Sequence, residues 1–328
     1  MVESHLDVLA IGEVMGLLDP ETSGPLEDVT RFNLRIAGAE GNVLITLARL
    51  GHATALVSAV GADPLGRLVT RTLADQGVNT EHVHVDPLAP TGVFFKECLD
   101  DGARRVYYYR SGSAASRLRF DFSDLEQVGA PRILTLSGVT LGLGGETGLA
   151  MVARNALCWA ASHDCTVVFD PNLRQTLWDG PRAVNDFAEV LPYIDVLLAG
   201  REELATLMPS SDPDEAARDL CRAGMSAVVL KDGAKGACVY EMSRVTDIAP
   251  YPIDVVVDPV GAGDAFAAGV ISGLLNGWPI GDGARIGAVL GARAVTMSGD
   301  WESASTGEDP RRVLEQYTSA LSLVEEQA

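Results

Sequence analysis

The chain has 328 residues, of which 47% are hydrophobic and 21% are charged, and this composition excludes a largely disordered protein. Its 45 acidic and 25 basic residues give a formal net charge of −20, which disfavours nucleic acid and anionic membranes as partners. Five cysteines without a C-x-x-C pair, an N-terminus unlike a signal peptide, and no apolar run near the roughly 20 residues of a membrane span indicate a cytoplasmic protein.

Strand and helix patterns alternate through the first ninety residues. Continuous apolar or β-branched runs predict strands or extended segments at 6–11, 14–18, 29–36, 53–58 and 83–85. Apolar residues at helical spacing predict helices at 40–50 and 65–76, which end at Gly51 and Gly77. The first helix would start just after residues 37–39, so that Gly38 and Asn42 would lie at a helix N-terminus.

A hairpin interrupts this alternation. The segments 91–99 and 104–110 flank Asp100, Asp101 and Gly102, a turn sequence typical of β-hairpins. Paired with the short extended segments near the N-terminus, the hairpin predicts a small sheet that stands off the main sheet as a lid. We expect this lid to comprise about 12–37 and 91–111, within a single domain of residues 1–328.

From residue 132 the alternation becomes regular, which predicts an α/β fold with a doubly wound, mostly parallel sheet flanked by helices. The expected strands are 133–137, 166–170, 196–199, 227–231, 237–240 and 255–257. The expected helices are 146–161, 183–191, 214–223, 284–297 and 311–325. Ligands of such sheets bind at the carboxyl ends of the strands.

The segment 258–264, DPVGAGD, follows the valine run 255–257 and precedes an apolar helical pattern. The start of a helix leaves N–H groups unpaired and carries partial positive charge, so this turn could hold an anion. Asp264 could then accept a proton from a hydroxyl that attacks a bound phosphate. The same spacing also suits an ordinary helix start in which Asp264 is simply an N-terminal acid.

Other nucleotide and metal signatures are weak or absent. The sequence has no G-x-x-x-x-G-K-[ST] motif, and the glycine run 142–148 misses the G-x-G-x-x-G spacing by one residue. His82 and His84 are two residues apart in a segment expected to be exposed, which indicates a surface pair rather than a metal site.

The segments 37–42, AGAEGN, and 258–264 resemble, in order and separation, the two signatures of the ribokinase-like (PfkB) carbohydrate kinases. The resemblance spans nearly the whole chain. It implies a ribokinase-like fold with a small β-sheet lid, and ATP and Mg²⁺ as cofactors, and it leaves a monovalent cation open. Asp264 would be the general base, and Gly261, Ala262 and Gly263 would cradle the transferring phosphoryl group.

Three stretches look most like 2-keto-3-deoxygluconate kinases: 107–116, 170–178 and the A-E-x-N form of the first signature. The resemblance implies a substrate site formed by Gly38, Asn42, Phe94, Tyr108, Arg110 and Arg174. Arginine suits this role because its guanidinium binds a carboxylate in bidentate geometry. The residues alone also allow a surface charge at Arg110, a structural ion pair at Arg174 and lid packing at Tyr108.

The ATP site implied by the resemblance contains Lys231, Gly233, Lys235 and Gly236, which could equally form a plain hairpin turn. Glu203 would hold Mg²⁺ indirectly, through water. The chain departs from the family at Gly200, where an asparagine usually precedes Glu203, at Ala37, which replaces a glycine, and at Phe94, where related kinases often have tyrosine.

The sequence therefore predicts an ATP-dependent kinase that phosphorylates the terminal primary hydroxyl of 2-keto-3-deoxygluconate. A fructokinase-like or nucleoside kinase of the same family remains open, as does a sugar-binding regulator without turnover, because of Gly200. An apolar outer face of the lid would need a second copy to cover it, which predicts a homodimer through the lid. The candidate outer residues are Val14, Leu17, Phe32, Leu34, Phe94 and Tyr107.

Overall fold

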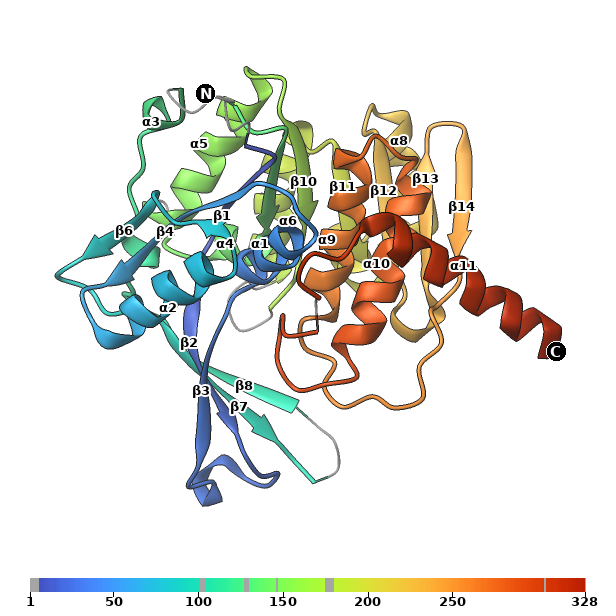
Figure 1. Ribbon diagram of the computed structural model, residues 1–328. Coiled ribbons are helices and arrows are strands. Elements are labelled where there is room, and N and C mark those ends of the chain that lie inside the picture. The colour runs from blue at the N-terminus through green and yellow to red at the C-terminus, as the bar shows by residue number, and fades with distance from the viewer. Residues whose placement is uncertain are drawn as a thin grey trace.

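The computed structural model describes residues 6–100, 104–126, 130–145, 147–174, 180–303 and 305–327. It contains a ten-stranded main sheet flanked by helices and a separate four-stranded sheet (Figure 1). Of the predicted hairpin turn at Asp100, Asp101 and Gly102, the last two residues lie outside the described residues.

The main sheet has the strand order β14-β13-β12-β11-β10-β9-β1-β4-β5, and β6 also pairs with β4. Pairing is parallel except between β12 and β13 and between β13 and β14, so the predicted doubly wound, mostly parallel sheet is confirmed. Its strands are β1 (Val8–Ile11), β4 (Thr54–Gly61), β5 (Val78–Asn79), β6 (Val83–Asp86), β9 (Ile133–Ser137), β10 (Thr166–Asp170), β11 (Val196–Gly200), β12 (Ala227–Lys231), β13 (Ala237–Glu241) and β14 (Arg244–Ile248).

Helices cover both faces of this sheet. Their bounds are α1 (Ala39–Arg49), α2 (Pro64–Asp75), α3 (Ser123–Glu126), α4 (Gly138–Gly142), α5 (Leu149–Ala161), α6 (Gly180–Val190), α7 (Arg201–Leu207), α8 (Pro213–Arg222), α9 (Ala262–Leu275), α10 (Ile280–Ala294) and α11 (Pro310–Gln327). Among the described residues, none of the helices is both long enough and apolar enough to cross a membrane.

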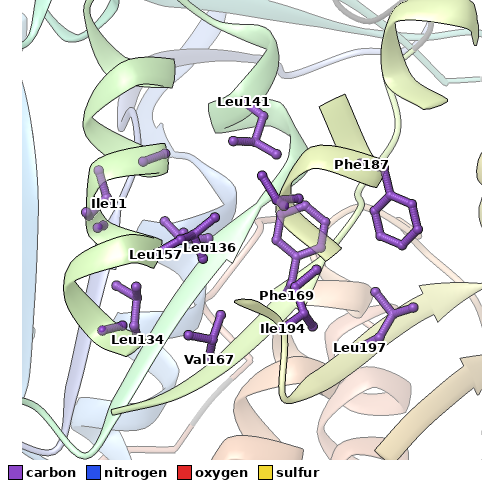
Figure 2. Packing of buried hydrophobic residues seen from close by; sticks show 14 of the residues in the cluster. Ile11, Leu134, Leu136, Leu141, Leu157, Val167, Phe169, Phe187, Ile194 and Leu197 are labelled. Carbon is purple, nitrogen blue, oxygen red and sulfur yellow. The ribbon is translucent and has the colours of Figure 1, made fainter. Parts of the chain in front are cut away.

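Alternate residues of the central strands enter two different cores, because successive side chains of a strand point to opposite faces. On β1, Leu9 and Ile11 pack under α4 to α8, in the core that Figure 2 shows from close by. Val8 and Ala10 enter the second core, under α1, α2, α9, α10 and α11. Burial on both faces explains why these strands are continuous apolar runs in the sequence.

The small sheet has the order β3-β2-β7-β8, with β2 (Met15–Pro20), β3 (Phe32–Ala37), β7 (Val93–Cys98) and β8 (Arg104–Tyr109). It extends away from the main sheet in Figure 1. Its inner face has an apolar cluster of its own, which contains Leu17 and Phe94. Its outer face exposes Leu34, Tyr107 and Tyr109.

The prediction that Val14, Leu17 and Phe94 lie on the outer face of this sheet is therefore wrong. Leu17 and Phe94 are buried on the inner face, and Val14 precedes β2 and packs on α1 at Gly41. Their apolar character was correctly recognised, but the side of the sheet was not. The alternation of a strand defines two faces without saying which one meets the rest of the protein.

The predicted strand at 255–257 is also wrong. Val255, Val256 and Val257 are 62%, 61% and 42% exposed and lie in an irregular segment between β14 and α9. The Val257 N–H donates to the Val295 carbonyl, beyond the end of α10, rather than to a neighbouring strand. β-Branched residues favour strands when they pack on a pleated, half-buried surface, and this segment has no such surface.

Candidate active site

A cavity of about 370 Å³ lies between the carboxyl ends of the main-sheet strands and the inner face of the small sheet. The predicted residues that line it are Gly38, Asn42, Phe94, Tyr108, Arg110, Arg174, Glu203, Lys231, Gly261, Gly263 and Asp264. Gly233, Lys235 and Gly236 are not among its lining residues, and nor is Ala262, although Ala262 begins α9. Residues far apart in the sequence thus meet at one site.

Two helix starts face this cavity, and each depends on a glycine. A Cβ at Gly38, just before α1, would overlap the backbone carbonyl of Glu13. Gly261, just before α9, has a φ of 83°, and a Cβ there would overlap the carbonyl of Asp300. Only glycine fits both positions, because each has main chain where a side chain would start. The amides at the start of α9 thereby come close to the cavity.

Asp264, in the first turn of α9, is held by Asn42 of α1. The Asn42 amide Nδ2 donates to Asp264 Oδ2 at 2.7 Å, and Asn42 itself is buried. This contact comes in addition to the predicted contact of Asn42 with a sugar hydroxyl, and it fixes the predicted base. Oδ1 of Asp264 is not engaged by Asn42 and can accept a proton.

The environment of Asp264 makes its carboxyl group a weaker acid. The pKa of Asp264 is raised to about 7, and desolvation is the largest cause. The nearby carboxylates of Asp170 and Asp300 also raise this pKa, whereas the Asn42 hydrogen bond and the charge of Arg174 lower it. A carboxyl group with this pKa is suited to take up a proton near neutral pH and to release it again.

Arg110 is buried at the end of β8, with 5% of its surface exposed, which excludes the alternative of a surface charge. Its Nε donates to Glu13 Oε2 at 2.7 Å, and its guanidinium lies over the Tyr108 ring at 5.5 Å. The ring centroid of Tyr108 lies 5.6 Å from that of Phe94. Glu13 Oε1 is buried at the same cavity and has no hydrogen-bond partner among the described residues.

Lys231, at the end of β12, provides positive charge beside the start of α9. Its Nζ lies 2.6 Å from Asp170 Oδ2 and 4.0 Å from the place that a Cβ of Gly263 would occupy. Although desolvation opposes it, the carboxylates of Asp170 and Glu203 raise the pKa of Lys231 above its ordinary value. The ammonium group therefore stays charged at neutral pH.

Lys235 is in a different position. Its side chain is 80% exposed and lies 3.8 Å from Asp232. Together with Gly233 and Gly236 it belongs to a turn between β12 and β13, outside the lining of the cavity. A nucleotide would have to extend beyond the cavity to reach this turn.

Glu203 links two walls of the cavity. Its Oε2 accepts the Gly200 N–H at 2.7 Å, and its Oε1 accepts the Leu173 N–H at 2.8 Å. It thereby fixes the segment that carries Arg174, whose side chain is exposed. The rest of the predicted 170–178 motif, from residue 175, lies outside the described residues. Nowhere in the described ranges do three or more histidine, cysteine or acidic side chains form a group able to hold a metal ion.

Five residues of the site were not predicted. Four of them line the cavity: Glu13, Glu40, Asp170 and Asp300. The fifth, Lys96, binds Asp300. Asp170 is the last residue of the buried strand β10, and Glu13 follows the buried strand β1 after Gly12. These positions could have indicated a ligand site. Glu40 is buried and accepts hydrogen bonds from Ser137 and Thr140. Asp300 follows α10 in an irregular loop, where the sequence gives no comparable signal.

The family model described as pfkB family carbohydrate kinase matches residues 5–306. Two curated relatives, both 2-dehydro-3-deoxygluconokinases, are each 32% identical: one from Thermoproteus tenax, with 95% of each chain covered, and one from Bacillus subtilis, with 92% of this chain and 94% of the relative covered.

Solved structures agree with this match. The structure of 2-dehydro-3-deoxygluconokinase from Thermotoga maritima has 26% identity and a TM-score of 0.84, with 96% of this chain and 100% of that chain covered. A structure from E. coli, described as a ribokinase II in complex with ATP and Mg²⁺, has 25% identity and a TM-score of 0.85, with 96% and 99% covered.

Proposed function

Because the chain belongs to the pfkB family of carbohydrate kinases, we propose that it phosphorylates the terminal primary hydroxyl of 2-keto-3-deoxygluconate, also written 2-dehydro-3-deoxygluconate, with ATP. The observation that carries this proposal is that one cavity is lined by Asp264, which lies in the first turn of α9, by Lys231 and by the two arginines Arg110 and Arg174. The relatives named above support this choice of substrate.

In the proposed reaction, Asp264 takes the proton of the sugar hydroxyl as its oxygen attacks the γ-phosphorus of ATP. A new bond forms between this oxygen and phosphorus, the bond to the β-phosphate oxygen breaks, and ADP leaves. The amides of Gly261, Ala262 and Gly263 and the ammonium of Lys231 stabilise the charge of the transferring group. Asp264 then releases its proton to solvent.

Mg²⁺, when bound, would neutralise the ATP phosphates. The donor set fits an indirect contact, because each Glu203 oxygen accepts one backbone N–H from the described part of the chain and keeps a lone pair for a water ligand. Lys235, Gly233 and Gly236 remain our candidates for the distal part of ATP. A requirement for a monovalent cation stays open, and the predicted cytoplasmic location is part of this proposal.

For the substrate, we assign the carboxylate and keto end to Arg110, Arg174 and Tyr108. The Nε of Arg110 is occupied by Glu13, which leaves its terminal N–H groups for a carboxylate. The unpartnered Oε1 of Glu13 is a buried acceptor that a sugar hydroxyl could satisfy. Gly38 and Phe94 complete the wall around the sugar.

A panel of acceptors tests the proposed reaction. With ATP and Mg²⁺, we expect ADP formation to be fastest with 2-keto-3-deoxygluconate, because two guanidinium groups favour an anionic substrate over neutral fructose, other hexoses or nucleosides. A faster reaction with fructose would favour the alternative of a fructokinase-like enzyme, and a faster reaction with a nucleoside would favour a nucleoside kinase. If calorimetry shows that a sugar binds but no acceptor gives ADP, the result would favour the alternative of a sugar-binding regulator without turnover. Gly200, in place of the usual asparagine, suggested that alternative.

We also propose that a second copy covers the outer face of the small sheet. Leu34 on β3 and Tyr107 and Tyr109 on β8 are 53%, 40% and 66% exposed, which leaves apolar and aromatic surface facing solvent. At micromolar concentration, light scattering should give the mass of a dimer for the wild-type protein and of a monomer for Tyr109→Asp.

The matched control for this substitution is Val85→Asp. Val85 is 61% exposed on β6, a strand of the main sheet, and a charge at this position should leave the dimer intact. A monomeric wild-type protein would contradict the proposed dimer. So would a Tyr109→Asp protein that remained a dimer.

A further inference from the structure

Lys96 is a buried cation on the inner face of the small sheet. It lies on β7, and only 1% of its surface is exposed. Its Nζ is 3.1 Å from Asp258 Oδ2 and also binds Asp300 Oδ1. One ammonium group therefore joins three parts of the chain: the small sheet, the segment before α9 and the loop after α10.

Burial alone would make this arrangement costly. Desolvation opposes the charged form, but the carboxylates of Asp300 and Asp258 raise the pKa of Lys96 above its ordinary value. A buried ion pair adds little stability over apolar residues of similar size, whereas it fixes the groups that it joins in one arrangement. The site thus gains a defined geometry more than it gains stability.

Both acidic partners of Lys96 touch the turn that leads to Asp264. Oδ1 of Asp258 accepts the Val260 N–H at 3.1 Å, within the same segment. The carbonyl of Asp300 fills the space beside Gly261. Lys96 consequently holds Asp258 and Asp300, and these two residues support the turn around Gly261. In the proposed reaction, the amides of this turn face the transferring phosphoryl group.

The same strand also reaches the sugar side of the cavity. Phe94, two residues before Lys96 on the same face of β7, lines the cavity and contacts the ring of Tyr108. A displacement of β7 when the sugar binds would move Lys96 as well, because both side chains are attached to one short strand.

We propose that Lys96 is a positioning residue that couples the small sheet to the turn 258–263, so that the turn adopts its active geometry when the sheet is in place over the sugar. This inference rests on the proposed kinase reaction. Lys96 touches neither substrate in this scheme; it acts through Asp258 and Asp300. Its removal should therefore affect turnover more than binding.

The first test is Lys96→Met, which keeps the length of the side chain and removes the charge. We expect kcat to fall about 10–100-fold, with both KM values within about threefold of wild type, because a small misplacement of the turn weakens transition-state contacts. The control Arg222→Met removes an exposed cation on α8, 67% exposed in its side chain, and should keep wild-type kcat. An unchanged kcat in Lys96→Met would overturn the proposal.

The second test asks whether Lys96 acts through Asp258. The double variant Lys96→Met/Asp258→Asn should be no less active than the less active of the two single variants, because each substitution removes the same link. Losses that multiply would show that the two residues act separately, and would also overturn the proposal. If Lys96→Met does not fold, as judged by circular dichroism, Lys96→Gln provides the same comparison.

A third measurement is independent of the substrate. Hydrogen exchange of residues 258–263 in the unliganded protein should be about tenfold faster in Lys96→Met than in wild type, because the turn loses a support. Exchange at wild-type rates would contradict the link. If the wild-type protein phosphorylates no acceptor, the proposed reaction fails, and the exchange experiment still decides whether Lys96 holds the turn.

Discussion

Asp264→Asn is expected to lower kcat by about 10²–10⁴-fold, because an amide cannot take the proton of the attacking hydroxyl. The substitution is nearly isosteric, and an asparagine oxygen at position 264 can still accept the 2.7 Å hydrogen bond from Asn42. Binding of ATP and of the sugar acid, measured by calorimetry, should therefore be kept. Normal turnover by this variant would refute the assignment of Asp264 as the base.

The pH dependence of the wild-type protein gives a second measure of Asp264. The proton acceptor must be ionised, and the pKa of Asp264 is raised to about 7, so kcat/KM should rise with pH through that value and then level off. Because the Asn42 hydrogen bond lowers this pKa, Asn42→Ala should move the midpoint to higher pH. A midpoint that stays at the wild-type value would contradict this role of Asn42.

Arg110→Met is the second substitution with a large expected effect. It leaves Glu13 buried without its cation, which should cost about 3–5 kcal/mol of the free energy of unfolding. It also removes the proposed partner of the substrate carboxylate, so kcat/KM for the sugar acid should fall by about 100-fold or more. Thermal unfolding and steady-state kinetics measure the two effects separately.

A double variant separates structure from recognition at this position. Arg110→Met/Glu13→Gln removes the uncompensated charge and should recover stability, because a neutral amide costs less to bury than a carboxylate. It should not recover activity with the sugar acid. If Arg110→Met kept its preference for the sugar acid over fructose, Arg110 would have only the structural role that its ion pair shows.

Much of the main sheet could be predicted because its strands carry their own signal. Segments such as 8–11 and 167–169 are apolar throughout, as expected for strands covered on both faces. The run 255–257 has the same composition but no neighbouring strand, and no local pattern reports whether a neighbour exists. The helix α7 was not predicted, because it has only seven residues and follows Gly200 rather than a capping side chain.

The residues of the site also fall into two groups, those that could be predicted from the sequence and those that could not. Asp264 and Gly261 could be found because a turn and a helix start are local features of a few consecutive residues. That Asn42 holds Asp264 could not be found, because 222 residues separate the two. Lys96 is more extreme: its partners lie 162 and 204 residues away, and one of them, Asp300, is in an irregular loop. Such contacts depend on how sheets and helices pack.

Strand β8 carries three consecutive tyrosines, Tyr107, Tyr108 and Tyr109, and this repetition has a consequence for pairing. A slip of one residue against β7 would still place a tyrosine opposite Phe94, so these side chains cannot define the register of the strand. Arg110 can, because the slip would carry its guanidinium away from Glu13. The buried ion pair at the end of β8 therefore sets which tyrosine faces the cavity and which tyrosines face the solvent.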